Sequence, residues 1–194
     1  MDENTLPTGV TEQTPENIML GAGTIHNGLA YVNGAWNFDE TLVGATLGGN
    51  KLSIKPEVKQ IEVDGAYVAV KGLDVKLGET AQMEINFVEL TPEIMKSALI
   101  AEATTSPVAG YTQLESKPQI TEGDYWLNVA FVGQRLDGKA VIAVLPNAIC
   151  TSGLDLEGKK KDPSVQKVTF EARQQLTGDL RKLPYQIYYP EEEN

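Results

Sequence analysis

The residues best suited to chemistry in this chain are its single histidine, His26, and its single cysteine, Cys150. A serine or cysteine nucleophile needs a base beside it, and His26 is the one imidazole available for that role. His26 lies just before the turn pair Asn27-Gly28 with no catalytic motif around it, so we expect a surface turn histidine. Cys150 ends an apolar stretch and is expected in the core, where free cysteine behaves as a small hydrophobe.

Carboxylates are the second source of possible chemistry, because 27 residues are Asp or Glu. A pair of them could hydrolyse a glycosidic bond, but in so acidic a chain some pair always looks suitable, and we expect solvated surface instead. Asp155, Glu157 and Asp162 share a loop with three lysines and do not have EF-hand spacing. The glycine-rich residues 21–23 and 44–49 lack the Gly-Lys-Ser/Thr of a nucleotide loop. The sequence therefore predicts no catalytic residue, no cofactor and no metal ligand, and a protein that is not an enzyme.

Length and charge restrict the class of protein further. The chain has 194 residues, with 16 basic against 27 acidic side chains and a net charge of -11, which fits one domain or at most two. No apolar run approaches the roughly 18 residues of a membrane span, and the acidic start predicts no secretory signal. A pI near 4.6 argues against general affinity for nucleic acid, which needs clustered lysine and arginine.

Turn and alternation patterns predict a mainly β protein, a β-sandwich or barrel with one flanking α-helix. Four dipeptides suit tight hairpins, because glycine adopts positive φ there: Asn27-Gly28, Asn33-Gly34, Asp64-Gly65 and Asp137-Gly138. Strands are expected over residues 52–55, 59–64, 67–76, 80–90, 124–132, 140–145, 164–173 and 184–189. Within 124–132, strict alternation puts Leu127, Val129 and Phe131 on one face and Trp126 on the other.

One helix is expected over residues 92–102, with Thr91 as its N-cap, Pro92 at the first helical position and Leu99 in a buried apolar stripe. Residues 1–16 are polar enough to form an extended N-terminal arm that is ordered only by a partner. We expect residues 17–190 to form a single domain and residues 191–194 to form an acidic C-terminal tail.

A family resemblance is carried by short segments in a fixed order along residues 18–100. The segments are Leu20-Gly21-Ala22-Gly23, Gly44-Ala45-Thr46, Gly48-Gly49-Asn50-Lys51, Glu62-Val63-Asp64-Gly65, Lys71-Gly72-Leu73 and Glu89-Leu90-Thr91-Pro92-Glu93. With these segments, the stretch Gly44 to Leu99 resembles the tail tube (major tail) proteins of long-tailed bacteriophages. The second half of the chain agrees with that family only in its β character.

The resemblance implies a β-sandwich with a flanking helix, assembled with copies of itself into hexameric rings. Stacked rings form a tube that conducts the viral genome from capsid to host cell, so the expected location is the virion tail, after assembly in the bacterial cytoplasm. Expected partners are other tail proteins (tape measure, tail terminator, and baseplate or distal tail proteins), with DNA passing unbound and no membrane. The family has no catalytic residues to carry over.

Three alternatives to this reading stay open. The first is the inner tube protein of a contractile tail or of a phage-derived bacteriocin. The second is an isolated carbohydrate-binding β-sandwich module, with Trp36, Trp126 or Tyr111 as stacking platforms. A glycosidase-like enzyme comes third.

Geometry and alternation suggest which residues would face the pore. If six subunits give about four strands each, a barrel of about 24 strands has a backbone diameter on the order of 50 Å and a hole of roughly 35 to 40 Å. A pore that conducts DNA must not hold it, because each lysine would add a phosphate contact. Candidate lumen-facing residues are the polar positions Gln82, Glu84, Asn86 and Glu171. A candidate inter-ring loop lies within residues 41–51 and contains Gly44, Gly48, Gly49, Asn50 and Lys51.

Overall fold

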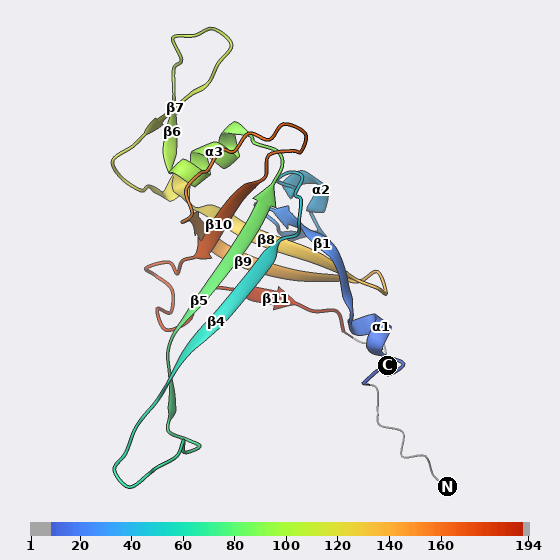
Figure 1. The fold of residues 1–194 in the computed structure, drawn as a ribbon, viewed down its shortest axis with the longest axis vertical. Coiled ribbons are helices and arrows are strands. Elements are labelled where there is room, and N and C mark those ends of the chain that lie inside the picture. Colours follow the sequence, from blue (N-terminus) through green and yellow to red (C-terminus); the bar gives the residue numbers. More distant parts are fainter. Residues whose placement is uncertain (1–8, 192–194) are drawn as a thin grey trace.

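The computed structural model describes residues 9–191 as a mainly β chain with few, short helices around one large antiparallel sheet (Figure 1). This confirms the predicted mainly β class. The sheet has the strand order β1-β8-β9-β10-β5-β4, and β11 pairs with β9. In chain order the elements are α1 (Thr14–Asn17), β1 (Met19–His26), β2 (Tyr31–Val32), β3 (Ala35–Trp36), α2 (Phe38–Thr41), β4 (Lys51–Gln60), β5 (Asp74–Phe87), α3 (Pro92–Leu99), β6 (Ala101–Thr104), β7 (Gln113–Ser116), the 3-10 helix η1 (Glu122–Asp124), β8 (Trp126–Arg135), β9 (Ala140–Cys150), β10 (Gln166–Ala172) and β11 (Gln186–Tyr188).

The core lies between two parts of this sheet. One part is β4, β5 and β10, and the other is β1, β8 and β9; the two are joined by only three residue pairs between β9 and β10, from Phe170↔Cys150 to Ala172↔Ala148. Period-two alternation in β5 and β10 points every second side chain into this core. The buried cluster includes Met83, Ile85, Phe87, Val168, Phe170, Trp126, Val129, Phe131, Leu145, Cys150, Ile94 and Ala98.

The second face of β8 and β9 is also covered. Leu29, Ile142 and Val144 form a smaller buried cluster there, against which Trp36 and Phe38 pack. The nearly continuous apolar run predicted for residues 140–145 is thus explained, because β9 contributes side chains to both clusters.

The hairpin of β4 and β5 is the longest feature of the fold and projects away from the body (Figure 1). Its ladder runs from Lys51↔Glu84 to Gln60↔Asp74, with an irregularity between Glu57 and Val58. The predicted strands over 59–64 and 67–76 are therefore wrong for most of their length, since residues 61–73 form the loop at the tip. The turn pair predicted at Asp64-Gly65 lies inside this loop, with Gly65 at φ 89°.

Strict alternation also fails in β8, and a backbone feature explains why. Asn128 has the left-handed φ of 48°, which shifts the pleat by one residue. Trp126 is consequently buried on the core side, whereas Leu127 is 57% exposed, the reverse of the sequence prediction.

The predicted helix is present, but it is shorter than expected. The backbone N–H of Ile94 donates to Thr91 Oγ1 at 3.2 Å, which confirms the predicted N-cap. The helix ends at Leu99, because Ile100 adopts a left-handed conformation (φ 49°) and Ala101 begins β6. Leu99 is 50% exposed, so its predicted burial is wrong; Ile94 and Ala98 are the buried residues of α3.

The end of α1 and the segment after β11 are in contact with each other. The Tyr189 hydroxyl donates to Asn17 Oδ1 at 2.9 Å, and the short helix α1 begins inside the segment predicted as an extended arm. Most of the predicted C-terminal tail, residues 192–194, and the first eight residues of the arm lie outside the described residues.

Candidate functional site

A polar face covers the outer side of β4, β5 and β10, opposite the core. We call it the polar face and define it by the outward side chains of the three strands. Its members are Lys51, Ser53, Lys55 and Glu57 on β4, Thr80, Gln82, Glu84 and Asn86 on β5, and Lys167, Thr169 and Glu171 on β10. All four predicted lumen-facing residues belong to it, so the structure brings them together on one surface. Whether this surface faces a pore stays a prediction.

Glu84 lies at the centre of the polar face and pairs with lysines on both neighbouring strands. Lys51 Nζ is 2.9 Å from Glu84 Oε1, and Lys167 Nζ is 2.6 Å from Glu84 Oε2, so each carboxylate oxygen takes one lysine. The hydrogen bonds from Lys167 and then Lys51 lower the pKa of Glu84 to about 2. The carboxylate therefore stays ionised at any pH near neutrality.

The other three predicted lumen-facing residues differ in the hydrogen bonds and ion pairs that their side chains make. Glu171 Oε2 accepts from Arg173 Nη2 at 3.0 Å, just beyond the end of β10. The Asn86 side chain donates to Gly49 O at 2.7 Å, so it fastens a loop to β5. Gln82 stands opposite Ser53 and Glu171 in the ladders and is half-buried.

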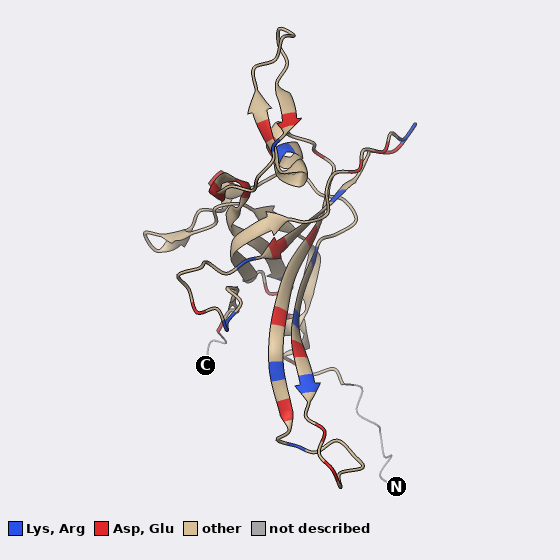
Figure 2. Cartoon of the chain, turned by 90° about the vertical axis from the view of Figure 1, so that its left-hand side faces the viewer, with Lys and Arg blue, Asp and Glu red and all other residues tan. Residues whose placement is uncertain are grey.

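The charge of the polar face differs from that of the whole chain. Its strand residues include three lysines, Lys51, Lys55 and Lys167, and three glutamates, Glu57, Glu84 and Glu171. The overall net charge of -11 is thus not concentrated here. We expected lysines to be absent from a surface that meets DNA; on the polar face they are present, and two of the three are paired with Glu84. Figure 2 shows blue and red segments alternating along the long hairpin.

The predicted inter-ring loop lies against the body. Leu47 N donates to Asn86 O, Val88 N donates to Ala45 O, and the Asn50 side chain donates to Ala22 O, so the loop is held along the end of β5. Gly44 has a φ of 157°, a backbone conformation that residues with a Cβ rarely adopt, which favours glycine at this position. Gly48, Gly49 and Lys51 continue this held segment into β4. Contact of the loop with a second ring stays a prediction.

Sequence reasoning missed the tip of the long hairpin as an exposed apolar surface. The sequence predicts strands over 59–64 and 67–76, and valine, isoleucine and tyrosine recur in both. In the structure these side chains have no sheet partner to pack against: Tyr67 is 98% exposed and Val68 is 77% exposed. Ile61, Val63 and Val70 of the same loop are also exposed. The missed signal is an apolar run directly around the Asp64-Gly65 turn, where a simple hairpin tip would be polar.

A second projecting hairpin lies at the opposite end of the molecule. β6 and β7 extend past α3, away from the tip of β4 and β5 (Figure 1). The loop between them exposes Val108 and Tyr111. The elongated molecule therefore carries exposed apolar side chains at both ends.

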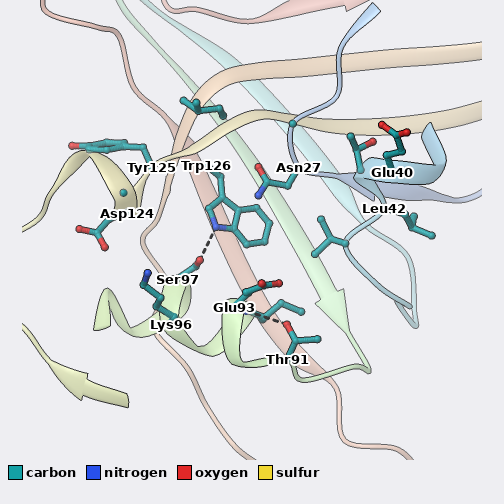
Figure 3. A pocket seen from close by; sticks show the side chains of 16 residues that line it. Asn27, Glu40, Leu42, Thr91, Glu93, Lys96, Ser97, Asp124, Tyr125 and Trp126 are labelled. Atoms are coloured by element: carbon teal, nitrogen blue, oxygen red, sulfur yellow. Dashed lines mark hydrogen bonds between the residues drawn. The ribbon is translucent and has the colours of Figure 1, made fainter. Parts of the chain in front are cut away.

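A cavity of about 540 Å³ lies between α2, α3 and η1 (Figure 3). Trp126 lines it, but the indole is buried and its Nε1 donates to Ser97 Oγ at 2.6 Å. Asp124 also lines it, and its carboxylate is taken up by Lys117 at 2.5 Å and by Thr121. Burial opposes ionisation of Asp124, yet these hydrogen bonds outweigh it and lower the pKa. The Trp126 indole N–H and the Asp124 carboxylate are thus already engaged by protein side chains.

The three aromatic platforms proposed for carbohydrate binding do not come together. Trp126 is buried, Tyr111 lies in the β6–β7 loop, and Trp36 packs within an aromatic group that includes Phe38 and Tyr188. The ring centroids of Trp36 and Tyr188 are 5.0 Å apart. The stacking role suggested for Trp126 is therefore wrong.

His26 is buried, which corrects the prediction of a surface turn histidine. Its Nδ1 lies 3.0 Å from Thr41 Oγ1, and its Nε2 lies 2.9 Å from Thr24 Oγ1. Burial lowers the pKa of His26, against a smaller opposing effect of the Phe38 backbone. Cys150 is buried, as predicted. The Cys150 thiol lies 3.6 Å from Ser152 Oγ, and the His26 ring contacts the two threonine hydroxyls instead of the thiol.

Comparison with known proteins adds no identification: no protein-family profile and no curated protein sequence matches the chain. Within residues 9–191, no three His, Cys, Asp or Glu side chains come together so as to hold a metal ion. No helix in that range has the length and hydropathy needed to cross a membrane.

Proposed function

We propose that this protein is the structural subunit of a bacteriophage tail tube, which assembles as stacked hexameric rings around a DNA-conducting lumen. The proposal includes the finer fold assignment, a tail-tube β-sandwich with a flanking helix. The observation that carries it is the elongated subunit with different exposed apolar hairpins at its two ends (Figure 1). Two different surfaces at opposite ends favour head-to-tail contacts, which build open stacks rather than closed dimers.

Lateral closure of a ring also fits the strand order. β1 and β4 are the outer strands of the described sheet, and open edges favour pairing with another chain. On β4 the edge is guarded by Pro56, by Lys55 and Lys59, and by the irregularity after Glu57. The part of the β4 edge that lacks these features is short, which favours pairing with one specific neighbour over open-ended aggregation.

The polar face then supplies the lumen. In a ring, the β4–β5–β10 part turns its core side toward the rest of the subunit, so its polar side is free to face an aqueous pore. Pairing of Lys51 and Lys167 with Glu84 lowers the number of unpaired cations on that side. This supports passage of DNA without retention.

Negative-stain electron microscopy of the purified protein tests the proposal directly. We expect rings or hollow tubes. Dispersed monomers at all concentrations and salt conditions would overturn it. Deletion of residues 2–15 gives a second test: the subunit should stay folded, because α1 contributes no buried residue, but should no longer form long tubes.

A further inference from the structure

Glu84 holds two lysines that are otherwise open to solvent. The side chains of Lys51 and Lys167 are 65% and 63% exposed, whereas that of Glu84 is 23% exposed. Burial therefore does not keep the two ammonium groups from an external anion. The Glu84 carboxylate competes with such an anion for the two lysines. Because Glu84 belongs to the same sheet, its pairing avoids the loss of translational and rotational freedom that binding of an external anion costs.

The arrangement resembles a lysine pair on a phosphate group. Two acceptor oxygens of one anion each receive one ammonium group, at 2.9 Å and 2.6 Å. The lysines come from strands on either side of β5, so their positions are fixed by two ladders: Lys51 stands opposite Glu84, and Lys167 stands opposite Asn86. Ser53 and Thr169 lie on the same face and carry hydroxyl groups that suit phosphate oxygens.

We infer that Glu84 is an internal counter-ion that occupies Lys51 and Lys167 in place of backbone phosphates, and that this pairing keeps duplex DNA from binding the polar face. The inference rests on the proposed function only in taking DNA as the polyanion that meets this face. According to this inference, weak DNA binding by a face with three lysines results from the Glu84 pairing and not from the overall acidity of the chain.

Glu57 provides a matched control on the same face. It lies on β4, carries the same charge and has no ion-pair partner among residues 9–191. Glu57→Gln therefore removes one negative charge without releasing a lysine. Glu84→Gln removes the same charge and releases two.

The test is the affinity of the full-length protein for a fluorescent DNA duplex, measured by anisotropy over a series of salt concentrations. For Glu84→Gln we expect tighter binding at low salt and a slope of log affinity against log salt that steepens by up to about 2, one unit for each released lysine that gains a phosphate. Glu57→Gln should stay close to wild type. Adding Lys51→Gln and Lys167→Gln to Glu84→Gln should return the slope to the wild-type value.

Equal effects of Glu84→Gln and Glu57→Gln would show that Glu84 acts only through its net charge, and this would overturn the inference. Unchanged DNA binding by Glu84→Gln would also overturn it. If Glu84→Gln does not fold, the double variant Lys51→Gln/Lys167→Gln in the wild-type background decides. Its slope of log affinity against log salt should equal that of wild type, because both lysines are occupied, and a shallower slope would show that they already contact phosphates. The measurement needs no rings, so absence of tubes by microscopy overturns the proposed function without deciding this one.

Discussion

Trp126 Nε1 donates a hydrogen bond of 2.6 Å to Ser97 Oγ, which joins the start of β8 to the middle of α3 (Figure 3). The indole ring is buried against Phe170, with ring centroids 4.4 Å apart. This one contact positions the helix on the sheet by both a polar and an apolar link, and it explains why the tryptophan is not available for ligand stacking.

Ser97→Ala should therefore destabilise the subunit by about 1–3 kcal/mol, because the buried indole N–H loses its acceptor. For a chain of this size that corresponds to a fall in melting temperature of roughly 2–4 °C per kcal/mol. Thermal or urea unfolding measures it. In the Trp126→Phe background the same serine change should cost much less, since the donor is already gone; an undiminished cost would contradict the proposed link.

Two positions of α3 make opposite predictions for the same substitution. Ile94 is 1% exposed and Leu99 is 50% exposed. Ile94→Asp should destabilise the subunit by at least about 3 kcal/mol, because it buries an unpaired charge. Leu99→Asp should change stability by only about 0.5 kcal/mol or less. Urea unfolding of both variants checks this pair, and equal destabilisation would show that the helix is docked differently.

The buried ion pair of Lys117 and Asp124 predicts a larger loss. Their side chains are 11% and 3% exposed. Lys117→Met leaves the Asp124 carboxylate buried without its cation and should cost about 3–5 kcal/mol. Replacing both residues by apolar ones should cost less than this single change. Near pH 3 the gap between wild type and Lys117→Met should narrow, because Asp124 has a lowered pKa and its stabilising ionised form is lost as the pH falls.

His26 predicts a separate acid dependence at higher pH. Its pKa is below the ordinary 6.5, so the unfolded chain binds a proton before the folded one does. The neutral form is favoured by folding; its contribution is complete above pH 6.5 and is lost as the pH falls through the folded pKa. Unfolding free energy should therefore fall as the pH decreases below about 6.5. His26→Gln should flatten that decline, and an equally steep decline in the variant would assign it to other groups.

Much of this fold could be predicted from the sequence, because local chemistry determines it. Thr91 and Pro92 indicate the start of α3. The turn pairs Asn33-Gly34 and Asp137-Gly138 join paired strands, as predicted. The failures have non-local causes. Ile100 adopts a left-handed conformation at a helix end where glycine is the usual residue, so residue type gave no signal there. Asn128 adopts the same conformation, which asparagine tolerates, but inside a strand whose alternation gave no sign of it.

The candidate site was predictable in part for the same reason. Alternation alone assigned Gln82, Glu84 and Asn86 to one face of β5. Alternation does not give the register between strands, and the register is what brings Lys51 and Lys167 to the same carboxylate. Sequence therefore predicted the polar positions but not their pairing. Burial of His26 was missed because α2 covers it through Thr41, a contact fifteen residues away.

The exposed tip of the long hairpin gives the sharpest test of stacking. Tyr67 and Val68 are exposed. They lie in the loop that joins β4 to β5, and neither residue takes part in the pairing of these two strands. Tyr67→Ser/Val68→Ser should therefore leave the unfolding free energy within about 0.5 kcal/mol of wild type, because no core contact is removed. It should at the same time abolish long tubes, because the end surface loses its apolar anchors. Leu176→Ser is the matched control, since Leu176 is 92% exposed in a loop away from the tip. Tube length by negative-stain microscopy measures the effect; full-length tubes from the double variant, or equal shortening by Leu176→Ser, would assign stacking to another surface.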